Sequence, residues 1–126
     1  MRRPWRTRAS LKTSRHGPNT EGDIRWAELS PVRGREQAVR RPVLVLSHDV
    51  FNERSGTVIA VAMTSQEPRA GFPLTLESQA DGLTRQSWIK ISQIRTLSVD
   101  RVGQRLARAS EEELAPVLDG LNEILG

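Results

Sequence analysis

Residues 41–46 read Arg-Pro-Val-Leu-Val-Leu, and residues 57–65 read Thr-Val-Ile-Ala-Val-Ala-Met-Thr-Ser. Both contain short apolar runs of the kind that fills a buried strand; a proline opens the first, and β-branched residues are frequent in the second. Residues 47–56 lie between them, begin with residues that often cap helices and end at a glycine, which predicts one short helix. Two central strands joined by a short helix are therefore the framework around which the other segments are placed.

Further strands are predicted on both sides of this framework. Residues 23–29 form a strand with Ile24 and Trp26 on one side and Arg25 and Ala27 on the other. Trp26 is interpreted as a core residue rather than as a platform for a nucleic-acid base. Three later segments are also predicted to be strands: 72–76, 87–91 and 103–108. Strands in quick succession with one helix last favour a mainly β fold, either a small β-barrel or an α+β domain.

The C-terminal segment carries the signature of an α-helix. Ser110 and Glu113 form a capping box, and apolar residues follow at helical spacing as far as Leu125. Pro116 would cost about 3 kcal/mol inside a helix, and Gly120 about 1 kcal/mol relative to alanine. The sequence therefore predicts a helix that packs on the barrel, with a kink or a 3₁₀ start near Pro116.

The net charge of +4 is unevenly distributed over the 126 residues. Residues 1–21 carry six bases and one acid, and residues 110–126 carry five acids and no base. We interpret residues 1–21 as a disordered basic extension and residues 22–126 as the folded domain. The extension could tether RNA through phosphate contacts, or it could be idle. The body between the two ends is basic, which is compatible with binding a polyanion on one side.

Several classes of function are disfavoured by composition. The chain has no cysteine and only two histidines, so it has no disulfide and no conventional zinc site. We therefore expect no cofactor, and chemistry that either needs no metal or uses an ion held by carboxylates. It has no apolar stretch of membrane-spanning length and no signal-peptide core, which predicts a cytoplasmic protein without a membrane partner.

Polar residues gather at the ends of the two central strands. The turn before the first strand contains four arginines and one glutamate within residues 33–41, and Thr64 and Ser65 close the second. Binding and catalytic groups are often built where rigid strands end. This arrangement predicts a site rather than a merely solvated turn.

The order of motifs over residues 22–126 resembles the MazF/PemK group of toxin–antitoxin endoribonucleases. The residues that carry the resemblance are Gly22-Asp23-Ile24-x-Trp26, Leu29-Ser30-Pro31-x-x-Gly34-x-Glu36-Gln37, Arg41-Pro42-Val43-Leu44-Val45, Asn52, Thr64-Ser65, Gly71-Phe72-Pro73 and Gln93-Ile94-Arg95-Thr96. The resemblance implies an SH3-like β-barrel, of the kind shared by PemK and CcdB proteins, with a C-terminal helix. It also implies a homodimer that cleaves single-stranded RNA sequence-selectively and without metal, and a cognate MazE-like antitoxin with an acidic, partly disordered segment.

The resemblance and the chemistry of the side chains together assign roles to individual residues. Cleavage without metal can use the 2′-OH of the RNA as nucleophile, giving 2′,3′-cyclic phosphate and 5′-OH ends. Arg41 would neutralise the charge on the phosphate, and Thr64 would hydrogen-bond a phosphate oxygen or the 2′-OH. Ser65 and Glu36 are supporting candidates, Glu36 as a proton acceptor. The other expected RNA contacts are Arg33, Arg35 and Arg40 to phosphates and Gln37 and Gln93 to bases.

The sequence departs from the family at two places, and two other functions are compatible with it. Ala38 and Val39 stand where relatives often have glycines, and His48 stands where they commonly have asparagine, so the preferred RNA sequence is not fixed; messenger RNA is the first candidate target. One alternative function is a CcdB-like poison of DNA gyrase on the same fold. The other is a module that binds RNA or protein without catalysis.

Overall fold

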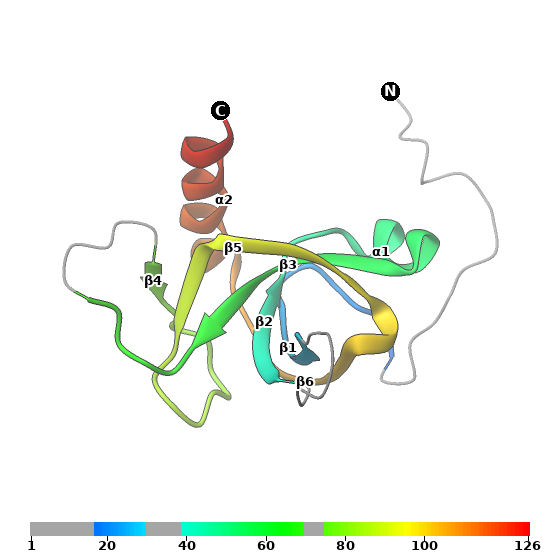
Figure 1. Ribbon diagram of the computed structural model, residues 1–126, viewed down its shortest axis with the longest axis horizontal. Helices are drawn as coiled ribbons and strands as arrows, with labels where there is room; N and C mark the ends of the chain where they lie inside the picture. Colours follow the sequence, from blue (N-terminus) through cyan, green and yellow to red (C-terminus); the bar gives the residue numbers. More distant parts are fainter. Residues whose placement is uncertain (1–16, 30–38, 70–74) are drawn as a thin grey trace.

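The two apolar runs form neighbouring strands at the centre of the sheet, as predicted. They are β2 (Arg40–Val45) and β3 (Thr57–Thr64), paired antiparallel with Val43 opposite Ala62 and Val45 opposite Ala60. The computed structural model describes residues 17–29, 39–69 and 75–126, and Figure 1 shows their strands as a strongly curved sheet. The short helix α1 (Asp49–Ser55) joins β2 to β3 and is closed by Gly56 at φ +71°, in the left-handed region that glycine tolerates.

Four further strands complete a six-stranded antiparallel sheet. They are β1 (Asp23–Glu28), β4 (Thr75–Glu77), β5 (Trp88–Ser98) and β6 (Val102–Arg108). Their order in the sheet is β4-β5-β3-β2-β1-β6, and the short 3₁₀ helix η2 (Val99–Arg101) connects β5 to β6. The predicted mainly β fold, with a short helix after the second strand and a helix at the end, is confirmed.

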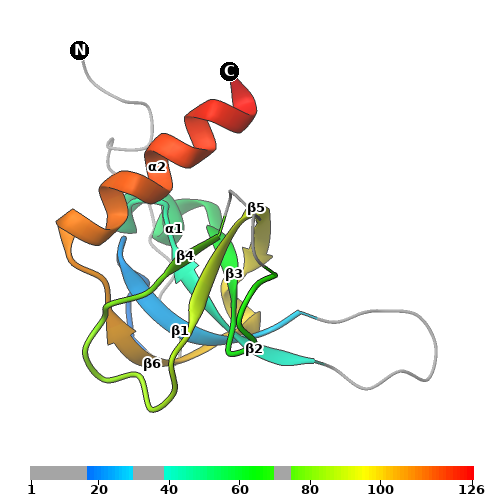
Figure 2. The same ribbon diagram turned by 90° about the vertical axis from the view of Figure 1, so that its left-hand side faces the viewer.

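The sheet buries apolar side chains on both faces, which explains why its central strands are apolar throughout. On one face Leu44 and Met63 pack in a cluster with Val117 and Leu121 of helix α2 (Glu111–Leu125), which lies across the sheet in Figure 2. On the other face the curled sheet closes on a smaller cluster: Ala27, Val43, Val45, Val58, Ala60, Leu97 and Val102. Each fully buried aliphatic side chain contributes about 1.5–3 kcal/mol, so this two-sided core is the main stabilising feature.

Helix α2 begins as predicted but continues through its proline. The Ser110 hydroxyl accepts a hydrogen bond from the Glu113 amide at 3.2 Å. The Glu113 carboxylate does not complete the capping box. It accepts hydrogen bonds from the Ser78 hydroxyl at 2.5 Å and from the Gln79 amide at 2.8 Å. The expected 3₁₀ start near Pro116 does not form, because α2 is one α-helix from Glu111 to Leu125. None of the helices in the described part of the chain is long and apolar enough to cross a membrane.

Two strand predictions need correction or lie partly outside the described residues. Strand β5 runs to Ser98 rather than ending near residue 91, so Gln93 lies within the strand and not beyond it. Residues 92–96 of β5 are exposed and mostly polar, so they do not form the apolar run by which a strand is recognised in a sequence. The register between β3 and β5 shifts between Val61 and Met63, where β5 carries extra residues. Of the strand expected at 72–76, residues 72–74 lie outside the described residues, and β4 begins at Thr75.

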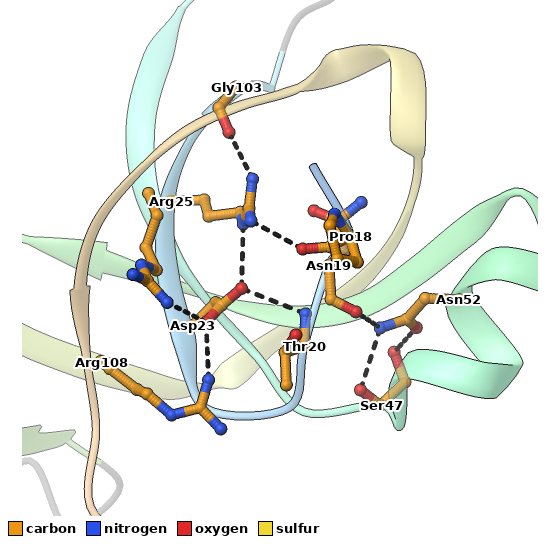
Figure 3. A network of polar contacts seen from close by, with 10 residues as sticks. Pro18, Asn19, Thr20, Asp23, Arg25, Ser47, Asn52, Gly103 and Arg108 are labelled. Carbon is orange, nitrogen blue, oxygen red and sulfur yellow. Dashed lines mark hydrogen bonds and ion pairs between the residues drawn. The ribbon is translucent and has the colours of Figure 1, made fainter. Parts of the chain in front are cut away.

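A buried network of ions and hydrogen bonds holds the start of β1 (Figure 3). The Asp23 carboxylate accepts from Arg25 Nε at 3.1 Å, from the Thr20 amide at 3.1 Å and from Arg108 at 2.9 Å. Arg25 donates onward to the carbonyls of Gly103 at 3.0 Å and Pro18 at 2.8 Å. Arg25 is only 3% exposed although it is charged, because these partners replace water around the guanidinium.

Asn52 of α1 extends this attachment to the residues before β1. Its side-chain amide is fully buried and donates to the carbonyl of Asn19 at 2.8 Å and to that of Ser47 at 3.0 Å. The Ser47 hydroxyl donates to the Asn52 side-chain oxygen (Figure 3) and accepts from the Ile59 amide at 2.9 Å. Residues 18–20 therefore contact the body of the domain. Residues 1–16 of the predicted extension lie outside the described residues, and the boundary placed at Gly22 stays a prediction.

Candidate RNA-binding cleft

A cleft of about 480 Å³ opens where β2 begins and β3 ends. Its walls come from these two strands, from the middle of β1, from β6 and from the loop before β5. The residues that line it are Trp26, Arg40, Arg41, Pro42, Met63, Thr64, Ser65, Gly82, Leu83, Thr84, Arg85, Ser87 and Leu106. Three of the predicted site residues, Arg41, Thr64 and Ser65, and the predicted phosphate contact Arg40 therefore share one cleft.

The pairing of β2 with β3 explains why Arg41 and Thr64 belong together. The bonded register runs from Val45 opposite Ala60 to Val43 opposite Ala62. Continued by two residues, the same register sets Arg41 opposite Thr64. Cross-strand partners have their side chains on the same face of a sheet. The guanidinium and the hydroxyl are thus presented together by two neighbouring strands at the centre of the sheet.

The Thr64 hydroxyl is oriented by its own backbone turn. Its Oγ1 accepts a hydrogen bond from the Gln66 amide at 3.1 Å. A hydroxyl has one hydrogen and two lone pairs, so the hydroxyl hydrogen is left to donate into the cleft. Thr64 is half-buried and Ser65 is exposed, which makes Thr64 the better fixed of the two hydroxyls.

The described lining of the cleft is positively charged. It contains the three guanidiniums of Arg40, Arg41 and Arg85 and no carboxylate. All three arginines are exposed, and in the described part of the chain none of them forms an ion pair with an acid. Guanidiniums next to hydroxyl donors favour an oxyanion such as a phosphate.

Arg85 is a cleft residue that the sequence analysis missed. It lies in the loop before β5, whose Ser87 hydroxyl donates to the Arg85 carbonyl at 3.1 Å. The loop is held against β6 at Gly82, where φ is +99° and a Cβ would lie 3.0 Å from the Leu106 carbonyl oxygen. Nothing in the local sequence distinguishes this arginine from a solvated one; only the turn at Gly82 and the packing on β6 bring it to the cleft.

Trp26 also belongs to the cleft, which changes its interpretation. It is half-buried rather than a core residue, and the guanidinium carbon of Arg40 lies 5.4 Å from the centre of its ring. That distance is within the range of a cation–π contact. The alternation of apolar residues along β1 predicted a core position for Trp26. It could not show that a cleft opens over this part of the strand.

The other predicted residues lie elsewhere or outside the described residues. Gln93 is exposed on β5 and does not line the cleft. His48 precedes α1, where its Nδ1 lies 3.6 Å from a carboxylate oxygen of Glu21. The predictions for Arg33, Arg35, Glu36 and Gln37 fall within residues 30–38, which lie outside the described residues. Within the described ranges, no three His, Cys, Asp or Glu side chains gather as metal ligands would.

Known proteins resemble this chain in sequence. The sequence profile of the PemK-like, MazF-like toxins of type II toxin–antitoxin systems matches residues 20–125. The chain belongs to this PemK/MazF family. Two relatives are endoribonuclease EndoA of Bacillus subtilis strain 168, 38% identical over 79% of this chain and 88% of that protein, and endoribonuclease MazF of Staphylococcus saprophyticus, 36% identical over 83% of this chain and 89% of that protein.

Solved structures of PemK/MazF proteins share the fold. MazF of Deinococcus radiodurans superposes with a TM-score of 0.72 at 30% identity, covering 86% of this chain and 97% of the other. A MazE–MazF complex from the same organism gives a TM-score of 0.73 at 31% identity, covering 86% of this chain and 96% of the other. The predicted family and fold are confirmed.

Proposed function

We propose that this PemK/MazF protein is an endoribonuclease toxin that cleaves single-stranded RNA. The observation that carries the proposal is the cleft in which Arg41 and Thr64, presented by adjacent central strands, meet two further guanidiniums and no described carboxylate. Relatives that are 36–38% identical are named endoribonucleases, which supports the same activity. The gyrase-poison alternative gains no support from these relatives, nor does a module without catalysis.

The side chains in the cleft suit attack by the 2′-OH of the RNA on the adjacent phosphorus. The bond from that oxygen to phosphorus forms, the bond to the 5′-oxygen breaks, and a proton must leave the 2′-OH while another reaches the departing 5′-oxygen. Arg41 would bind two non-bridging oxygens and stabilise the charge that grows on them. The Thr64 hydroxyl, whose hydrogen is left over after Oγ1 has accepted from Gln66, would donate to the same phosphate or hold the 2′-oxygen.

The groups that take up and supply protons are proposed to include residues outside the described part. No described lining residue is a carboxylate, so Glu36 remains the proposed proton acceptor. Ser65 is a supporting hydroxyl, and Arg33, Arg35, Gln37 and Gln93 remain proposed contacts to RNA. The products would carry 2′,3′-cyclic phosphate and 5′-OH ends, with no metal ion involved.

The partners follow from the same family. A MazE–MazF complex is among the similar structures, which supports neutralisation by a cognate MazE-like antitoxin with an acidic segment. Such a segment would complement the arginines of the cleft. We further propose that the protein acts as a homodimer in the cytoplasm, where messenger RNA is the first candidate substrate.

The test is cleavage of a single-stranded RNA of mixed sequence in excess EDTA, followed by analysis of the product ends. We expect cyclic-phosphate and 5′-OH ends from the wild type, and a rate lowered by at least about 100-fold in Arg41→Ala, because the developing phosphate charge loses its main counter-ion. Thr64→Val should also lose activity, whereas Thr64→Ser, which keeps the hydroxyl, should retain most of it.

The matched control is Arg101→Gln, which removes an exposed arginine of η2 that does not line the cleft. Its rate should equal that of the wild type. Intact RNA after incubation with the wild type, across many sequences, would refute the endoribonuclease assignment.

A further inference from the structure

We propose that Trp26 and Arg40 form a stacking site for one base of the bound RNA, next to the phosphate held by Arg41 and Thr64. This inference rests on the proposed function. It gives Trp26 and Arg40, which do not act on the reacting phosphate, a role in selecting the RNA. It rests on three features of the cleft: the placement of the ring, the apolar surface around it, and the freedom of Arg40.

The sheet places the indole and the guanidinium on one face. In the pairing of β1 with β2, Trp26 lies opposite Pro42 and Glu28 lies opposite Arg40, so all four side chains emerge on the same side. The guanidinium carbon of Arg40 lies 5.4 Å from the ring centre. Arg41, between Arg40 and Pro42, starts from the opposite side, so the two arginines can serve different parts of a nucleotide.

The ring shares the cleft with other apolar side chains that are not fully buried. Trp26, Pro42, Leu83 and Leu106 all line the cleft and are all partly exposed. Apolar side chains that are grouped in an open cleft often mark a ligand-binding groove, and a nucleotide needs an apolar surface for its base directly beside a cationic one for its phosphate. The lining of this cleft supplies both.

Arg40 covers the ring, and within the described ranges no acid fixes its guanidinium. Its cross-strand neighbour Glu28 forms no ion pair with it, nor does any other carboxylate in the described ranges. Rotation of the exposed Arg40 side chain would uncover the indole, and the guanidinium plane could then stack on the far side of a base that lies on the ring. Bases stack on aromatic rings and on arginine planes in single-stranded RNA recognition.

The experiment measures coupling between Trp26 and individual bases of the RNA. An oligonucleotide that the wild type cuts is made uncleavable by a 2′-deoxy nucleotide at the cut site, and each neighbouring base in turn is replaced by an abasic position. Dissociation constants are measured by fluorescence anisotropy for the wild type, Trp26→Leu, Trp26→Phe and Arg40→Gln. Arg101→Gln is the control for the loss of one arginine outside the cleft.

For the wild type we expect one abasic position to weaken binding by about 10- to 100-fold. Trp26→Leu should bind the intact RNA more weakly than the wild type by a similar factor. Removing that one base should not weaken its binding any further. Removing any other base should weaken binding by the same factor as in the wild type. Trp26→Phe, which keeps a ring, should fall between the two. It also preserves the test if the leucine variant does not fold, as thermal unfolding will show.

Two outcomes would overturn the inference. If every abasic penalty in Trp26→Leu equals that in the wild type, the ring is purely structural. Should the leucine variant not fold, penalties in Trp26→Phe that equal those of the wild type lead to the same conclusion. This holds even if the RNA is still cut, in which case the proposed endoribonuclease survives alone. If the wild type neither cuts RNA nor binds it in a way that depends on any base, the inference fails together with the proposed function.

Discussion

Among single residues, the buried ions at the start of β1 are expected to have a large energetic effect. Asp23 is 1% exposed and accepts from the equally buried Arg25, from the Thr20 amide and from Arg108. A buried charge pair of this kind adds little beyond a well-packed apolar pair, yet removing one partner leaves the other charge uncompensated. The network thus specifies how the chain enters the sheet more than it stabilises the fold.

Asp23→Asn should lower the free energy of unfolding by about 3–5 kcal/mol, because the Arg25 guanidinium would stay buried without its anion. Arg108→Gln is the matched variant: Arg108 is half-exposed, so its loss should cost no more than about 1 kcal/mol. Both values can be measured by urea unfolding. Equal losses in the two variants would show that Asp23 is not the centre of the network.

Part of the site could be predicted because it depends on residues next to the two apolar runs. Arg41 precedes the first run and Thr64 follows the second, so the two residues come close once these runs pair as antiparallel neighbours. The burial of Arg25 could not be predicted, because its partners at Pro18 and Gly103 lie in other segments. The same holds for Arg85, which reaches the cleft only through the turn at Gly82.

Among the elements, helix α2 shows how a local preference is overridden by packing. Gly120 is unfavourable in a helix, but a Cβ at this position would lie 2.8 Å from Cδ1 of Ile91 on β5. The glycine permits α2 to approach the sheet closely. Ser110 and Glu113 predicted where α2 begins, whereas no sequence pattern could show that the side chain of Glu113 would bind Ser78 and Gln79 instead.

Gly120→Ala should fall short of the gain of about 1 kcal/mol that helix propensity offers, because the new Cβ meets the end of the Ile91 side chain, which must turn away within the core. In an Ile91→Val background, which lacks Cδ1, the same substitution should recover the full gain of about 1 kcal/mol. Chemical unfolding of the four proteins in this double-mutant cycle measures the coupling. Strictly additive effects would contradict the close contact.

On the scale of the whole molecule, charge is separated between two ends. The arginines of the cleft lie where β2 begins and β3 ends, whereas α2 carries five acids and no base and rises away from that end in Figures 1 and 2. A polyanion approaching from solution is therefore attracted to one end and repelled from the other. RNA and an acidic antitoxin segment would compete for the same end.

Adding the cognate antitoxin should abolish RNA cleavage at about one equivalent per site. Its affinity should fall between about 50 and 200 mM salt, because charge attraction is screened. Arg40→Gln and Arg85→Gln should weaken binding, whereas Glu123→Gln on α2 should not. Titration calorimetry alongside the cleavage assay gives both quantities. Undiminished cleavage at saturating antitoxin would refute a shared binding site.

The bonds from Arg25 to the Pro18 carbonyl and from Asn52 to the Asn19 carbonyl have a practical meaning for producing the protein. A shortened version that starts at Gly22, where the family motifs begin, would strip two buried donors of their acceptors and let water reach both. We therefore expect a version that starts at Pro18 or earlier to be more stable than one that starts at Gly22. An affinity tag or a fusion partner belongs ahead of that proline.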